Sequence, residues 1–98
     1  MDELYKAILT LENVDECYRF FEDICTINEL LSMAQRLTIA KLLHGNRKWT
    51  EIEQETFASS ATISKVSKCM NYGTDGYSLV LNRLTKAPTT DKNKSQYL

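Results

Sequence analysis

The chain has 98 residues, of which 43% are hydrophobic and 26% are charged, and its formal net charge is −1. This composition is typical of one small folded domain and excludes wholesale disorder. The sequence holds no apolar run near the roughly 20 residues of a membrane span and no signal-peptide pattern, so we expect a cytoplasmic protein with no membrane partner.

Two helices, and the start of a third, are predicted in the N-terminal third of the chain, because apolar residues recur there at helical spacing. The first covers residues 2–10. Asn13 and Glu16 form a capping-box pattern before the second helix, and Thr26 and Glu29 form the same pattern before the third, which runs to a glycine. The first two helices carry broad aromatic and aliphatic faces that a chain this small can hardly cover alone, which favours a homodimer.

Residues 48–72 have the outline of a helix-turn-helix. A short helix over residues 50–56, with Thr50 as its N-cap, is followed by a break at residues 57–59 and a second helix over residues 60–70. In the second helix the apolar residues Ile63, Val66 and Met70 recur at helical spacing and can face a core. The outward face holds Thr62, Ser64, Lys65 and Lys68. A small, polar and positive face suits a helix in a major groove, although an ordinary helical pair would give the same pattern.

A last helix is predicted from an N-cap at Asp75 to Leu84, which completes about six helices in an all-α fold. Beyond it the composition changes to TKAPTTDKNKSQYL, with the only proline and few apolar residues. We therefore expect one domain over residues 1–84 and a disordered C-terminal tail over residues 85–98.

Charge is unevenly distributed along the chain. Residues 1–31 carry eight acidic and two basic side chains, whereas residues 32–98 carry five acidic and ten basic ones. The positive part contains the predicted helix-turn-helix, which suits an anionic partner.

No feature of the sequence indicates catalysis or metal binding. Cys17, Cys25 and Cys69 form no CxxC pair, and His44 has no neighbouring ligand residue, so neither a disulfide framework nor a metal site is predicted. Paired carboxylates, a nucleophile with a base and a glycine-rich phosphate loop are all missing. We therefore expect no enzymatic activity and no cofactor.

Two blocks of the sequence, FFEDICTINELLSMAQRLTIAKLL and ATISKVSKCMNYGTDGYSLVLNRL, resemble the bacterial Trp repressor superfamily, specifically its YerC/YecD branch of TrpR-related proteins. The resemblance implies an intertwined, all-α homodimer that presents two helix-turn-helix units to double-stranded DNA. It places Gln35 and Arg36 near the phosphate backbone, and Ser59, Ser60, Thr62, Ser64 and Lys65 near the major groove. By its charge, Lys68 joins the residues expected to neutralise phosphates.

The helix-turn-helix departs from the usual pattern at two positions. Glu53 stands where a small residue is usual, and Phe57 stands where glycine is usual. We expect Glu53 to complete a capping box with Thr50. Phe57 would cost on the order of 1 kcal/mol if the turn requires a positive φ there.

The resemblance also bears on a small-molecule effector. Tryptophan-responsive members of the family hold the indole between two arginines, with a glycine beside the second. Here Arg36 matches the first arginine, Lys65 replaces the second, and Val66 stands at the glycine position. Lysine cannot stack on a ring as a guanidinium does, and valine fills space that glycine leaves open. We interpret the three residues as the remnant of an effector pocket and expect no response to L-tryptophan.

The leading hypothesis is a sequence-specific DNA-binding transcriptional regulator, a repressor, that acts as a homodimer. The alternative is a non-catalytic helical dimer that serves as a protein-interaction adaptor and has lost DNA binding. The affinity for duplex DNA at different salt concentrations distinguishes the two hypotheses. The affinity of a DNA-binding protein falls steeply as salt rises, whereas an adaptor would not bind duplex DNA.

Overall fold

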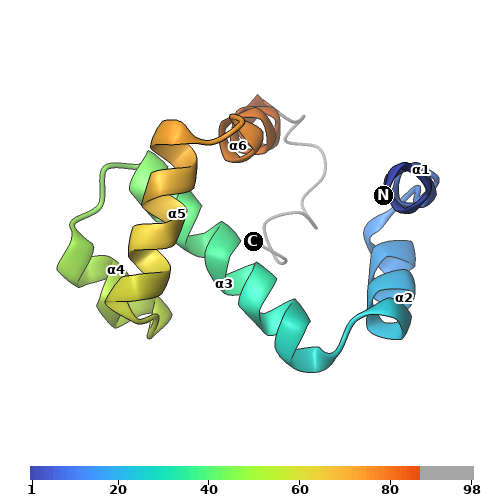
Figure 1. Ribbon diagram of the computed structural model, residues 1–98, viewed down its shortest axis with the longest axis horizontal. Helices are drawn as coiled ribbons and strands as arrows, with labels where there is room; N and C mark the ends of the chain where they lie inside the picture. Colours follow the sequence, from blue (N-terminus) through green and yellow to red (C-terminus); the bar gives the residue numbers. More distant parts are fainter. Residues whose placement is uncertain (87–98) are drawn as a thin grey trace. The chain divides into compact units, whose positions relative to one another are not determined.

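The protein is described by a computed structural model over residues 1–86. These residues form six helices and no strand, which confirms the all-α prediction (Figure 1). The helices are α1 (Asp2–Ile8), α2 (Val14–Ile24), α3 (Ile27–His44), α4 (Trp49–Thr56), α5 (Ser60–Tyr72) and α6 (Gly76–Lys86). The last two residues of α6 belong to the predicted tail, and the rest of that tail lies outside the described residues. No helix in the described part of the chain is long and apolar enough to cross a membrane.

The chain divides into two compact units, Met1–Met33 and the residues from Ala34 onward. The first unit contains both predicted capping patterns. Asn13 Oδ1 accepts a hydrogen bond from the Glu16 N–H at 2.9 Å, but the Glu16 carboxylate accepts from the Glu12 N–H instead of closing the box at Asn13. At the start of α3 the box between Thr26 and Glu29 is complete, with bonds of 2.8 and 3.1 Å. These local bonds define where α2 and α3 begin.

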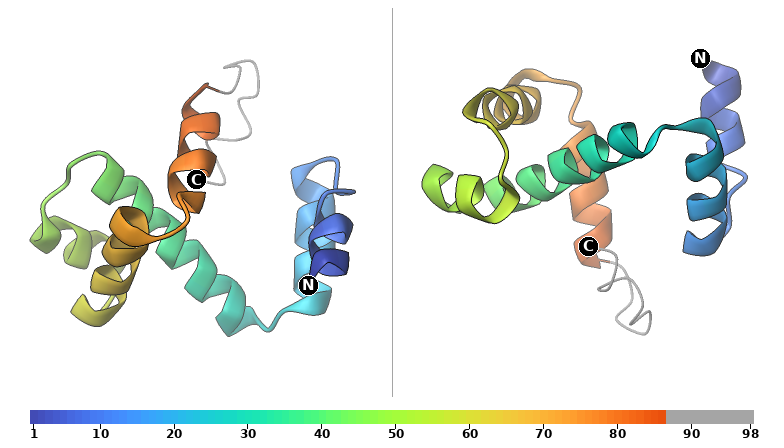
Figure 2. Two further views of the ribbon diagram at one scale, coloured as in Figure 1. Left: turned by 45° about the horizontal axis from the view of Figure 1, so that its top comes forward. Right: turned by 90° about the horizontal axis from the view of Figure 1, so that it is seen from below.

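The second unit holds the core. In Figures 1 and 2, α4 and α5 form a hairpin against the C-terminal part of α3, and α6 packs near Leu37 of α3. The buried residues come from α3, α4, the following turn, α5 and α6, and they are Ile39, Ala40, Ile52, Ala58, Ile63, Val66 and Leu81. Burial of Ile63 and Val66 confirms the inward face predicted for α5.

The connection between α3 and α4 differs from the sequence prediction. Asn46 adopts the left-handed conformation, with a φ of 59°, and the Arg47 N–H closes the helix end on the Leu42 carbonyl at 3.0 Å. α4 then begins at Trp49, with Lys48 as its N-cap.

The early start of α4 changes its cap. Glu51 is the third helical residue, and its carboxylate accepts the Lys48 N–H at 3.1 Å. The predicted cap at Thr50 and its partnership with Glu53 are therefore wrong, because these are the second and fifth residues of the helix.

Gly73 makes the link from α5 to α6 possible. A Cβ at this position would lie 2.3 Å from the carbonyl oxygen of Cys69, which is closer than carbon and oxygen approach one another. A Cβ at Gly76, by contrast, would meet nothing closer than a side-chain oxygen at 4.0 Å. Only the first of these two glycines is required by close packing of the backbone.

Candidate nucleic-acid interface

The turn between α4 and α5 is built on Phe57. Its φ of 57° and ψ of 20° place it in the left-handed region, and its N–H donates to the Glu53 carbonyl at 3.0 Å. The sequence predicted a break here, and the structure confirms it. An aromatic residue in this conformation costs on the order of 1 kcal/mol relative to glycine. The residue is 89% exposed, so its side chain gains little from packing within the fold.

Hydrogen bonds hold the turn in one conformation. The Thr56 hydroxyl donates to the Ile52 carbonyl at 2.7 Å and accepts from the Ala58 N–H at 3.2 Å. Gln35 of α3 donates from Nε2 to the Thr56 carbonyl at 3.0 Å, and Ala58 is buried in the core. Gln35, expected at a DNA phosphate, thus joins α3 to the end of α4. Its contact with DNA stays a prediction.

The N-terminus of α5 is capped by Ser59. The Ser59 Oγ accepts from the Thr62 N–H at 3.2 Å and lies 3.1 Å from the Thr62 Oγ1. Ser59, expected near the major groove, therefore also has a structural role. The free N–H groups of the first turn make this end of the helix positive, and no acidic residue stands in it.

Beyond the cap, the sequence-predicted residues lie along one helix. Ser60, Lys65 and Lys68 are exposed, and Thr62 and Ser64 are partly buried. All five belong to α5, which contains no acidic side chain. The helix thus carries hydroxyl groups and two exposed lysines, and its N-terminal end is electropositive.

α4 is acidic, and Arg47 balances part of its charge. The Arg47 guanidinium pairs with the carboxylates of Glu55 and Glu51, the latter at 3.5 Å. The hydrogen bond and negative charge of Glu55, and then those of Glu51, raise the pKa of Arg47. Glu53 has an exposed side chain on the same helix. The cationic surface of the hairpin is therefore α5, not α4.

The residues interpreted as an effector-pocket remnant lie in different environments. Val66 is 1% exposed and belongs to the core cluster with Ile39 and Ile63. Lys65 is exposed. Arg36 of α3 is partly buried, and its Nε is buried with no hydrogen-bond partner among the described residues. An unsatisfied guanidinium nitrogen of this kind is usually paired by water, an anion or another chain.

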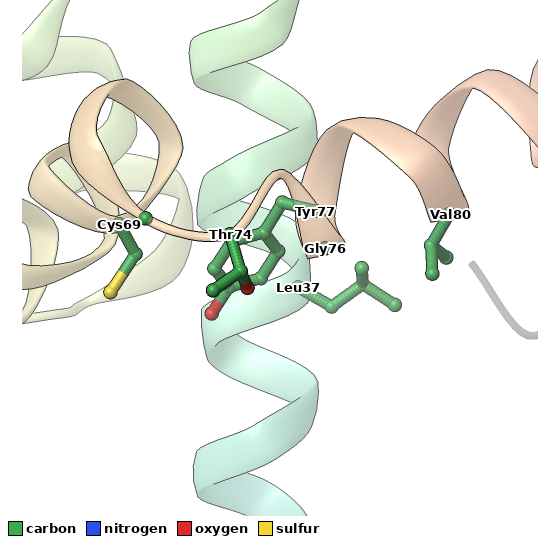
Figure 3. A pocket seen from close by; sticks show the side chains of 7 residues that line it. Leu37, Cys69, Thr74, Gly76, Tyr77 and Val80 are labelled. Carbon is green, nitrogen blue, oxygen red and sulfur yellow. The ribbon is translucent and has the colours of Figure 1, made fainter.

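The structure also forms an apolar cleft that the sequence did not reveal. It has a volume of about 600 Å³ and lies between α3, the end of α5 and the start of α6 (Figure 3). The lining residues are Leu37, Cys69, Gly73, Thr74, Gly76, Tyr77 and Val80. Periodicity could not predict the cleft, because it depends on how three separate segments pack. The pair of glycines at the α5–α6 link was its only signal in the sequence.

Metal-binding residues do not gather in the described part of the chain. Over residues 1–86 no group of three or more histidine, cysteine or acidic side chains is placed to hold a metal ion. The three cysteines are free thiols.

Comparison with known proteins finds a matching family, a related sequence and related structures. A model of the Trp repressor protein family matches residues 1–85. The chain is 48% identical over 94 residues to the uncharacterized protein YerC of Bacillus subtilis, covering 96% of this chain and 90% of that protein. A TrpR-like protein from Eubacterium eligens is 51% identical, with a TM-score of 0.83 and coverage of 86% of this chain and 87% of that one. A candidate Trp repressor from Staphylococcus aureus is 50% identical, with a TM-score of 0.84, and the match covers 86% of this chain and 84% of that one.

Proposed function

Because this chain belongs to the Trp repressor family, we propose that it is a sequence-specific DNA-binding transcriptional regulator, a repressor, that acts as a homodimer. The observation that carries the proposal is the surface of α5. It combines an electropositive N-terminus, exposed or partly buried hydroxyl groups and two exposed lysines, and the turn before it is held by hydrogen bonds. A preformed helix of this chemistry fits the major groove, where it meets both phosphates and base edges.

The residues divide into those that touch DNA and those that position the helix. In the proposal Ser60, Thr62 and Ser64 meet base edges directly or through water, and Arg36, Lys65 and Lys68 neutralise phosphates. Ser59 and Gln35 belong to the same interface, but their side chains are already engaged by the Thr62 N–H and the Thr56 carbonyl. We therefore assign them mainly the orientation of the helix pair.

Exposed apolar surface supports the homodimer. No residue of Met1–Met33 is buried, and large apolar side chains there are more than half exposed, among them Tyr5, Leu9, Ile24, Ile27 and Leu31. The cleft beside α6 is a second apolar surface. A soluble monomer rarely exposes this much apolar surface, whereas the interface of an obligate dimer covers it. A two-fold symmetric dimer would then require a roughly palindromic operator.

The environment of Val66 supports regulation without L-tryptophan. Its side chain already fills space in the core between α3 and α5, where the family resemblance would need a glycine. In the proposal, this packing holds α5 in its DNA-binding position with no effector present.

Selection of duplexes from a random library by the purified protein, at about 50 and 200 mM salt, tests the function. We expect a palindromic consensus and an affinity that falls by orders of magnitude between these salt concentrations. The double variant Lys65→Glu, Lys68→Glu should lose binding, whereas Lys6→Glu, the same substitution at one lysine of the first unit, should retain it. If no sequence is enriched and no duplex is bound at low salt, the regulator is excluded and the adaptor becomes the better explanation.

A further inference from the structure

Phe57 is the least expected residue of the turn. Three residues other than glycine have a positive φ in the described chain, namely Asn46, Phe57 and Asp75. Asparagine and aspartate adopt the left-handed region readily, because their short polar side chains bond to the local backbone. Phenylalanine has no such compensation. Its side chain also makes little contact with the fold, since the residue is 89% exposed.

The turn cannot relieve this strain by changing shape. The residues on either side are held by the Thr56 hydrogen bonds and by burial of Ala58 in the core. The backbone of Phe57 is therefore fixed, and its Cβ points in one direction from a rigid base. Strain that the fold itself does not offset is typical of positions that act on a ligand.

The neighbours of Phe57 indicate which ligand it meets. Ser59 and Ser60, at the start of α5, follow it within three residues, and they lie at the end of the helix proposed to enter the major groove. Any duplex that reaches these residues also reaches the turn. The principal apolar group in the major groove is the C5-methyl of thymine, and phenylalanine is one of the side chains that contact it.

We propose that Phe57 is a specificity-determining residue whose ring packs against the methyl group of a thymine at the edge of each half-site. This inference rests on the proposed DNA-binding function and extends it. Because the turn is already rigid, little conformational entropy is lost when the ring binds. In this proposal a contact with DNA, and not one within the chain, offsets the backbone strain at Phe57.

Substitutions that remove the strain and the ring together test this inference. Glycine and asparagine both accept a positive φ, so Phe57→Gly and Phe57→Asn should raise the midpoint of thermal unfolding. The same variants should bind the selected operator roughly tenfold more weakly, as expected when one methyl contact is lost in each of two half-sites. Phe57→Leu should keep the preference for thymine. Tyr72→Ala, which removes an 88% exposed aromatic ring at the opposite end of α5, should leave the affinity unchanged.

The DNA can be altered at the same contact. Replacing the preferred thymine by uracil removes only the methyl group, and we expect it to weaken binding of the unmodified protein while leaving Phe57→Gly unaffected. Equal responses of the two proteins to uracil, or an unchanged affinity of Phe57→Gly for the operator, would overturn the contact. In either case a palindromic consensus selected by the unmodified protein would still support the proposed function. If that protein selects no site, both proposals fail.

Discussion

Substitution of Ser59 separates the structural and DNA-binding contributions of one residue. The Ser59 hydroxyl accepts the Thr62 N–H at 3.2 Å, and its φ of −70° and ψ of 156° are those of a helix N-cap. Ser59→Ala leaves that N–H without its partner and should cost about 1 kcal/mol of unfolding free energy. For a domain of this size, a loss of 1 kcal/mol lowers the unfolding midpoint by about 4–8 °C.

Ser59→Asp should preserve the stability of the protein and weaken its binding to DNA. The carboxylate can accept the same N–H, and its negative charge interacts favourably with the positive end of α5, so stability should equal or slightly exceed that of the unmodified protein. A new negative charge about 4 Å from a DNA phosphate costs at least about 1 kcal/mol, so affinity for DNA should fall at least about fivefold.

Two measurements check this pair of variants. Thermal unfolding followed by circular dichroism, at one fixed protein concentration, gives stability, because the midpoint of a dimer depends on concentration. Fluorescence anisotropy of a labelled operator gives affinity. Asn13→Ala is the matched control, since Asn13 caps α2 through an equivalent bond of 2.9 Å and should lower stability without a specific loss of DNA affinity. Operator binding by Ser59→Asp as tight as that of the unmodified protein would refute the placement of this helix end at DNA.

Further predictions concern the backbone, the phosphates and the effector. Gly73→Ala should destabilise the protein by about 1–3 kcal/mol in chemical denaturation, because its Cβ would lie 2.3 Å from the Cys69 carbonyl oxygen, whereas Gly76→Ala should be neutral. Lys65→Ala should weaken binding to all duplexes and reduce the salt slope by roughly one per half-site, whereas Thr62→Ala should relax preference at one operator position; identical behaviour of the two variants would count against their assigned roles. Titration calorimetry should detect no L-tryptophan binding in the micromolar range, and binding that also tightens the operator complex would disprove the role given to Val66. Sedimentation at low micromolar concentration should give twice the chain mass of 11.3 kDa, and a folded monomer would exclude an obligate dimer.

The sequence alone determined those features that depend on neighbouring residues. The caps at Asn13 and Thr26 join residues three positions apart, so a short pattern specifies them. The buried face of α5 follows from helical periodicity, which placed Ile63 and Val66 inward. The break at Phe57 was also visible, because the apolar pattern changes phase between α4 and α5. Six helices and a helix-turn-helix outline could therefore be predicted without a structure.

Tertiary structure decided how the proposed interface is held. The bond from Gln35 to the Thr56 carbonyl joins residues 21 positions apart, and no local pattern indicates it. That bond and the burial of Ala58 fix the left-handed conformation of Phe57. The capping error at Thr50 has a different, local origin, because the chain leaves α3 through a closure in which the Arg47 N–H bonds to the Leu42 carbonyl and Asn46 is left-handed. Contacts between distant segments choose among backbone conformations that differ little in local free energy, and such contacts are formed only in the folded chain.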